Sequence, residues 1–482
     1  MYASPREWQL PQTATEHSLL ADDPRAHEYA SLYNRLLKGT PDESTRGEAA
    51  VFLRHELALG RELDDELPQS ADQLHEWMEA NTLAVHSKYT AYLAQRKTGS
   101  ARRFFTNRAH ALYVLRNVAP TKLVDGAWLY GLVKHAHNPK LSDLVRTYVE
   151  ELGAGDASKN HVVLYRELPN RYNLDPLDDI GDEFYRQGLI QLALGWNAQA
   201  FLPEVIGFNL GYEQLPLHLL IMAHELNELG LDPYYFTLHV TVDNGDTGHA
   251  RRACEAVLEM MPHLDDDGAF WQRVRAGSKL GSAGAGTMDA INNFDIDKEV
   301  LRILAQKSVV GNGAHSDYCR VAGKSVNEWL SCPAQIAGFL AALEGAGWIK
   351  RGLPPAQSRF WALLQGPRAE MFGVFSSYEL QVIHDWIRGE ASADGAAFTD
   401  DAAPQGHKRR ASFRSMERVR PTSARQLADD DLLDPDLIVL RQRLATACAQ
   451  ERAALLVELM SPALHWTPAG IVATREFWSA AH

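Results

Sequence analysis

Apolar residues recur at three- and four-residue spacing through most of the chain, and few stretches alternate between apolar and polar residues with period two. The first pattern is typical of amphipathic helices and the second of strands, so the sequence predicts an all-α fold built as a helical bundle. The expected helix at 201–229 contains two prolines and two glycines, which predicts a kink or a split. The strongest periodic segments predict helices at 103–117, 122–136, 141–151, 180–197, 201–229, 233–242 and 250–261.

Changes in composition along the 482 residues predict several structural units, as expected for a chain of this length. Residues 1–100 predict a polar, helical N-terminal extension, and residues 101–290 hold the long apolar-periodic helices of the expected bundle. Residues 291–390 predict a further helical region. Residues 391–430 combine a low-complexity stretch with a basic run, which is typical of a flexible linker. Residues 431–482 predict one amphipathic helix followed by a tail.

The charge and the cysteine content narrow the classes of function. The chain has 62 acidic residues and 48 Lys and Arg, for a net charge of −14, which argues against binding to nucleic acid or to an anionic membrane surface. Its four cysteines lie far apart without a Cys-x-x-Cys pair, which fits a reduced cytoplasm and argues against a cysteine zinc site. The N-terminus lacks a signal-peptide pattern, and no run of ~18 apolar residues occurs. We therefore expect a cytoplasmic protein that does not span a membrane.

The strongest candidate chemistry lies in the segment 234–249. His239 and Asp243 are one helical turn apart, so their side chains would leave the same helix face within roughly 40° of each other. Asp246 follows on nearly the same face, and His249 would lie about 80° away unless the intervening glycines bend the segment. Because apolar residues surround this set, the polar side chains must pair with each other or bind a metal.

A carboxylate and a histidine flank a glycine break further upstream. The predicted helix 141–151 ends in Glu150 and Glu151, and His161 follows a stretch containing two glycines. Ligands on either side of such a break can converge on one metal ion. The alternative is a solvated helix end followed by a histidine near a helix cap.

Two further carboxylates stand among apolar residues. Glu213, in a Tyr-Glu-x-x-Pro sequence, is flanked by residues expected in the core, where an unpaired carboxylate is costly. Asp125 lies in an apolar segment, where it is either an additional ligand or an ordinary helix N-cap.

In this order, these features resemble those of the haem-oxygenase-like diiron oxidases, also called iron-containing redox enzymes, over roughly residues 101–265. The resemblance implies a haem-oxygenase-like helical bundle in which three histidines and three carboxylates bind two irons. The five ligands carried over by position are Glu151, His161, Glu213, His239 and Asp243.

The sixth ligand departs from the family pattern. The family usually has a histidine three residues after the aspartate, where this chain has Asp246, and a histidine, His249, comes three residues later. We favour His249, because a third histidine completes the expected set, and keep Asp246 as the alternative. Some family members add a carboxylate from the preceding helix, a role that Asp125 would take here.

The resemblance implies a non-haem diiron oxidase or oxygenase that holds two Fe(II) per chain and uses O2 as co-substrate. It implies a small amino-acid-like or fatty-acid-like substrate, oxidised by N-oxygenation, desaturation or C–C cleavage in specialised biosynthesis, with an electron donor and a homodimer as expected partners. Mixed imidazole and carboxylate donors suit iron, and no His follows a Glu by three residues, so the ferritin-type motif is absent. The alternatives are a haem-binding or haem-degrading bundle and a non-enzymatic helical interaction protein.

Overall fold

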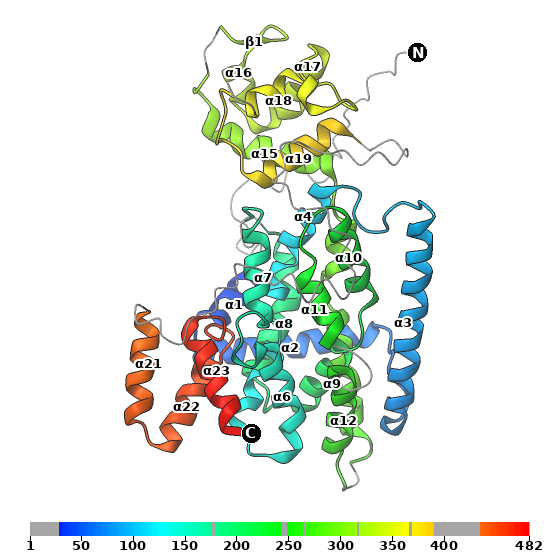
Figure 1. The fold of residues 1–482 in the computed structure, drawn as a ribbon, viewed down its shortest axis with the longest axis vertical. Coiled ribbons are helices and arrows are strands. Elements are labelled where there is room, and N and C mark those ends of the chain that lie inside the picture. Colours follow the sequence, from blue (N-terminus) through cyan, green and yellow to red (C-terminus); the bar gives the residue numbers. More distant parts are fainter. Residues whose placement is uncertain are drawn as a thin grey trace.

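The computed structural model consists of helices packed around an extended apolar core (Figure 1). Within the part of the chain that it describes, strands occur only as one short antiparallel hairpin, β1 (Arg320–Val321) with β2 (Lys324–Ser325). The all-α prediction is confirmed. No helix in these described ranges is both long and apolar enough to cross a bilayer. The described residues are 28–174, 180–242, 248–264, 266–315, 318–365, 369–389 and 434–481.

The N-terminal helices pack against the central bundle. Helix α1 buries Leu32, Tyr33 and Leu36, spaced as on one helix face, against α8. Helix α3 runs along one side of the molecule and buries only four of its 24 residues (Figure 1). The elements of this part are α1 (Glu28–Leu37), α2 (Glu43–Leu59), η1 (Gly60–Glu62), η2 (Ala71–Gln73) and α3 (Leu74–Lys97).

The central bundle has many short helices. Most of its apolar residues belong to one continuous core that also includes residues of α1 and α2. Its elements are α4 (Arg108–Asn117), α5 (Ala119–Lys122), η3 (Ala127–His135), η4 (Pro139–Leu141), α6 (Ser142–Glu151), η5 (Gly153–Gly155), α7 (His161–Asn170), η6 (Asp182–Phe184), α8 (Tyr185–Trp196), α9 (Leu202–Tyr212), α10 (Leu217–Glu228), α11 (Tyr234–Val242), α12 (His249–Met260), α13 (Ala269–Lys279), η7 (Leu280–Ser282) and α14 (Thr287–Asn292).

Helices α9 and α13 touch through glycines. A Cβ atom on Gly207 would lie 1.8 Å from the carbonyl oxygen of Val274, and one on Gly277 would lie 2.2 Å from the carbonyl oxygen of Glu204. Only glycine lets two helix backbones approach this closely. The ion pair between Glu204 and Arg273 joins the same two helices. The pairing of α9 with α13 fixes the end of α9, where Glu213 lies.

Two of the predicted helices differ in detail. The segment 201–229 is split as expected, but α9 is continuous through its glycines and the break falls at 213–216, ending at Pro216. The single helix expected at 122–136 is wrong. There α5 ends at Lys122, and a turn through Gly126, with φ of 80°, leads to the 3₁₀ helix η3. Because Gly126 occupies the N-cap position of η3, Asp125 is not the N-cap.

A second group of helices follows the bundle in sequence and forms the upper part of the molecule in Figure 1. Charged side chains connect this second group to the bundle. The backbone N–H of Ala109 in α4 donates to the carboxylate of Asp385, and Arg116 Nη2 lies 3.8 Å from Glu299 Oε1. Its helices are α15 (Ile296–Gly311), α16 (Val326–Leu330), η8 (Pro333–Gln335), α17 (Ile336–Gly345), η9 (Pro355–Gln357), α18 (Arg359–Leu364) and α19 (Ser377–Arg388).

The C-terminal part contains more helix than expected. Instead of one helix and a tail, it has α21 (Pro435–Thr446), α22 (Ala449–Leu459) and α23 (Pro468–Ala481). The predicted helix breaks where Cys448 adopts an extended conformation and its backbone N–H donates to the carboxylate of Glu451 at 2.9 Å. Helix α23 packs against η5 of the bundle and against α22.

Candidate metal centre

Six acidic and imidazole side chains from separate elements meet inside the bundle. Each is less than a tenth exposed, although such groups are seldom buried unless they are paired or bind a metal. Most of them lie at the ends of helices rather than in helix interiors. The six are Asp125, Glu151, His161, Glu213, His239 and His249.

The local sequence places Glu151 and His161 on either side of a sharp turn. Glu151 is the last residue of α6, because the chain then passes through Gly153–Gly155, which all have positive φ values. Helix α7 begins at His161, because the side-chain oxygen of Asn160 accepts the backbone N–H of Val163 and caps the helix.

Asp125, Glu151, His161 and His239 form the first group, whose ligand atoms all lie within 4.8 Å of one another. Asp125 Oδ2 is 2.8 Å from His239 Nε2 and 3.8 Å from His161 Nδ1. Glu151 Oε2 contacts His161 Nδ1, yet that nitrogen is buried without a properly oriented hydrogen bond in the described structure. The two imidazole centroids are 4.2 Å apart. These atoms therefore converge on one point instead of forming separate pairs.

Tyr235, one turn before His239, orients this group. His239 Nδ1 lies 2.9 Å from the carbonyl oxygen of Tyr235, which can only accept, so Nδ1 carries the proton. The Nε2 atom consequently faces Asp125. The hydroxyl of Tyr235 donates to Asp125 Oδ2 at 2.8 Å. A histidine held through its other nitrogen in this way is oriented as a metal ligand.

Glu151, Glu213 and His249 form the second group. His249 Nδ1 is 2.9 Å from Glu213 Oε2 and 3.2 Å from Glu151 Oε1. Glu213 stands at the C-cap of α9, and its Oε1 atom is buried with no hydrogen-bond partner among the described residues. A buried carboxylate oxygen without a donor is unfavourable, and a cation beside it would remove that cost.

Glu151 belongs to both groups. Its Oε2 atom faces His161 in the first group and its Oε1 atom faces His249 in the second. One buried carboxylate thus presents one oxygen to each set of donors, the arrangement of a carboxylate that bridges two metal ions.

Glu150 takes part in the site, although the family resemblance implied a ligand role only for its neighbour Glu151. Its Oε2 atom is 3.1 Å from His249 Nε2 and also accepts from Arg252. This contact holds the ring with Nδ1 towards Glu151 and Glu213, as carboxylates commonly do for metal-binding histidines. The only signal in the sequence was the Glu150–Glu151 doublet itself.

Charge pairing sets the protonation of the metal-free cluster. Burial alone lowers the pKa of His161, but the adjacent Glu151 carboxylate outweighs it and raises the pKa above its ordinary value. Burial also lowers the pKa of His249, but the carboxylates of Glu213 and its neighbours outweigh this effect and raise the pKa well above the usual range. Burial favours the neutral form of Glu151, yet the charge of His161 holds the pKa of that carboxyl well below normal. In the metal-free cluster both histidines therefore hold a proton more strongly than a free imidazole does, and a bound metal would have to displace it.

The donor set fits a pair of metal ions. Imidazole and carboxylate without thiolate suit iron or manganese, and carboxylates offset the charge of two cations. The unpartnered oxygen of Glu213 and the convergence of the first group on one point are what a bound cation would explain.

Two of the predicted ligands cannot be placed. Asp243 and Asp246 lie outside the described residues. The structure brings the other six candidate ligands together, with Asp125, the carboxylate suggested from the preceding helix, in the first group. His249 contacts two members of the second group, whereas the role of Asp246 stays a prediction.

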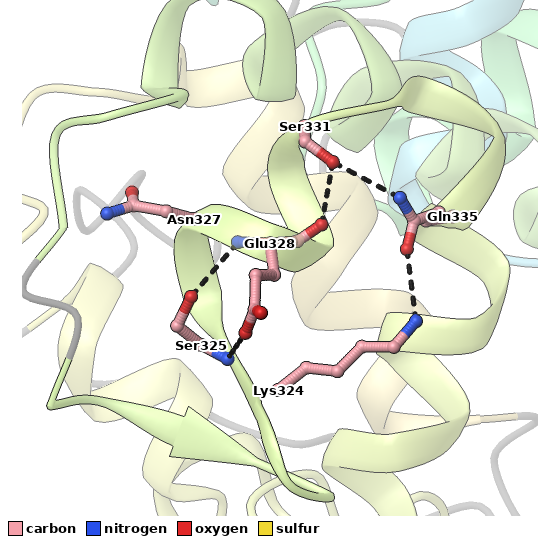
Figure 2. Close-up of a pocket in the computed structure, with 6 residues that line it drawn as sticks. All are labelled: Lys324, Ser325, Asn327, Glu328, Ser331 and Gln335. Carbon is pink, nitrogen blue, oxygen red and sulfur yellow. Dashed lines mark hydrogen bonds between the residues drawn. The ribbon is translucent and has the colours of Figure 1, made fainter.

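Surface pockets lie apart from this cluster. The pocket in Figure 2, about 520 Å³, lies beside the start of α16, and its side chains largely satisfy one another. Lys324 donates to Gln335, which donates to Ser331, and Glu328 caps the backbone of Ser325. Another pocket lies between η3 and helices α22 and α23. Neither contains any of the six clustered residues.

Residues 112–282 match the model of a family described as iron-containing redox enzyme. No curated protein and no solved structure matches the chain. All six clustered residues fall within the matched segment. The predicted resemblance to this haem-oxygenase-like family is confirmed, and it supports an iron-dependent oxidoreductase whose fold is a helical bundle.

Proposed function

We propose that this protein is a non-haem diiron oxidoreductase that uses O2 to oxidise a small metabolite. The observation that carries the proposal is the position of Glu151, whose two oxygens face two separate sets of buried donors. A site for a single ion would need only one of these sets.

Each iron would have its own ligands. Asp125, His161 and His239 would hold the first, Glu213 and His249 the second, and Glu151 would bridge them. The two groups have similar donors, so one metal would suit both. Asp243 stays an expected ligand from the sequence.

Two bound Fe(II) ions would supply the electrons that activate O2. The protein's part is to hold the ligands and to exclude water. Val124, Leu152, Val162 and Phe236 lie beside ligands or ligand-orienting residues in the sequence and are fully buried. Such apolar surroundings keep an oxidising species from side reactions with solvent.

The substrate class rests on the family resemblance rather than on this geometry. We propose an amino-acid-like or fatty-acid-like molecule that undergoes N-oxygenation, desaturation or C–C cleavage. An electron donor would be required where the substrate does not supply all the electrons that O2 consumes.

An anaerobic titration with Fe(II), followed by metal analysis and rapid mixing with O2, tests the proposal. We expect about two irons per chain and a transient visible absorption after mixing. His224→Ala is the control, because this histidine pairs with Glu228 at 3.2 Å outside the cluster and should leave both results unchanged. Iron well below one per chain without consumption of O2 would refute the proposal. A Soret band on addition of haem would instead favour a haem-binding bundle.

A further inference from the structure

The C-terminal helices touch the loop that separates two of the ligands. Residues 152–160, here called the ligand loop, connect Glu151 to His161. Helix α23 packs against this loop, as its place near α6 in Figure 1 suggests. The contacting residues, 460–475, lie outside the segment 112–282 that matches the family. They are therefore an addition to the bundle that carries the ligands.

Arg475 holds the first half of the ligand loop. Its Nε and Nη2 atoms donate to the carbonyl oxygen of Gly155 at 3.3 and 3.0 Å, across 320 residues of sequence. A Cβ atom on Gly155 would lie 2.7 Å from the backbone nitrogen of Arg475. With a φ of 81°, Gly155 also has a conformation that other residues rarely adopt. The loop and α23 are thus in backbone contact.

His465 holds the second half of the ligand loop. The side-chain amide nitrogen of Asn160 is 3.2 Å from His465 Nδ1, and it also donates to the carbonyl oxygen of Leu152 at 3.2 Å. Full burial lowers the pKa of His465 to about 3, so its ring is neutral and Nδ1 can accept. Asn160 therefore ties the end of α6 to the C-terminal segment while its oxygen caps the helix that begins at His161.

The two helices that flank the ligand loop make further contacts with the same segment. The hydroxyl of Tyr148 in α6 donates to the carbonyl oxygen of Met460. The guanidinium of Arg166 in α7 lies 3.7 Å from the ring centroid of Trp466. All four contacts act on the part of the chain between and around Glu151 and His161.

The ligand loop needs such support because its own backbone is unfavourable. Three consecutive residues have positive φ values, and one of them, Ala154, at 50°, is not glycine. Strained backbone of this kind persists only where the surroundings fix it. A shift of the loop would change the distance between Glu151 and His161, two donors that must meet at one ion.

We propose that the C-terminal helices position the metal ligands, with Arg475 and His465 as positioning residues that set the placement of Glu151 and His161. This inference rests on the proposed metal centre. It assigns a role in metal binding to C-terminal helices that lie far from Glu151 and His161 in the sequence.

The experiment compares metal binding in the full-length wild type, Arg475→Ala and Arg452→Ala. Arg452 pairs with Glu476 between α22 and α23 at 2.5 Å, so its removal perturbs the same helices without touching the ligand loop. Anaerobic Co(II) titration, read by visible absorption and by metal analysis, reports the affinity and the ligand geometry of each site. Circular dichroism and thermal unfolding of the metal-free proteins show that each variant is folded.

We expect Arg475→Ala to weaken Co(II) binding about tenfold and to change the absorption spectrum, as loss of a residue that supports metal ligands commonly does. Arg452→Ala should match the wild type, and Arg475→Lys, which keeps one donor, should restore part of the affinity. If Arg475→Ala does not fold, Arg475→Gln is judged by the same criterion.

Two results would overturn this inference and leave the proposed function standing. In the first, the wild type binds two metals and Arg475→Ala binds them with the same affinity and spectrum. In the second, Arg452→Ala loses as much Co(II) affinity as Arg475→Ala. A wild type that binds no metal would remove the proposed function and this inference together.

Discussion

The shared carboxylate leads to the sharpest prediction. Glu151→Gln keeps the shape of the side chain but replaces a bridging carboxylate by a neutral amide, whereas Glu213→Gln does the same to a residue of the second group only. We therefore expect Glu213→Gln to retain about one tightly bound iron per chain and Glu151→Gln to retain less than one, because it weakens both sites.

The size of the effect follows from the distances. His249 Nδ1 lies 2.9 Å from Glu213 Oε2, and at an effective dielectric constant of ~20 unit charges at that distance attract by about 6 kcal/mol before desolvation is counted. Removing one partner of a buried pair typically costs a net ~3–5 kcal/mol. A divalent ion carries more charge than an imidazolium, so the affinity of the altered site should fall by at least about 100-fold, at ~1.4 kcal/mol per factor of ten.

Anaerobic calorimetry with Fe(II), supported by metal analysis after desalting, measures stoichiometry and affinity together. His224→Ala controls for the effect of any substitution in the bundle. Two tightly bound irons in Glu151→Gln, or equal losses in the two carboxylate variants, would refute the assignment of Glu151 as the bridge.

Three further predictions concern protons and packing. Because the pKa values of His161 and His249 are raised, a metal must displace their protons, and the affinity for the metal should rise between pH 6 and 8. Calorimetry in buffers of different ionisation enthalpy should show the release of protons on binding. An affinity that does not depend on pH would contradict this prediction. Glu225 is fully buried and accepts three backbone N–H groups at 103–105, so Glu225→Gln should lower the free energy of unfolding in urea by about 3 kcal/mol while iron stoichiometry is unchanged. Gly207→Ala would press a methyl group against the backbone of α13 and should cost about 3 kcal/mol or more, seen as a lower melting temperature; a wild-type melting temperature would show that α9 and α13 can separate easily.

The sequence alone determined the fold class and much of the helix pattern. Helical periodicity is a local property, so α1 coincides with an apolar-periodic segment, and the break after Glu213 could be expected from Pro216. The same applies to the turn after Glu151, where glycines end α6. These features depend on residues within a few positions of one another, and they bring candidate ligands to helix ends that the sequence can identify.

Only the tertiary structure decided which groups meet. Asp125 reaches His239 across 114 residues and Arg475 reaches Gly155 across 320, and no local pattern encodes either contact. The turn at Gly126 directs Asp125 inward, where periodicity predicted a continuous helix. Glu150 takes part in the site only because the packing of α12 places His249 beside it. Local sequence fixes backbone conformation, but the packing of distant helices fixes which buried charges must pair, because the cost of an unpaired buried charge depends on its neighbours in space.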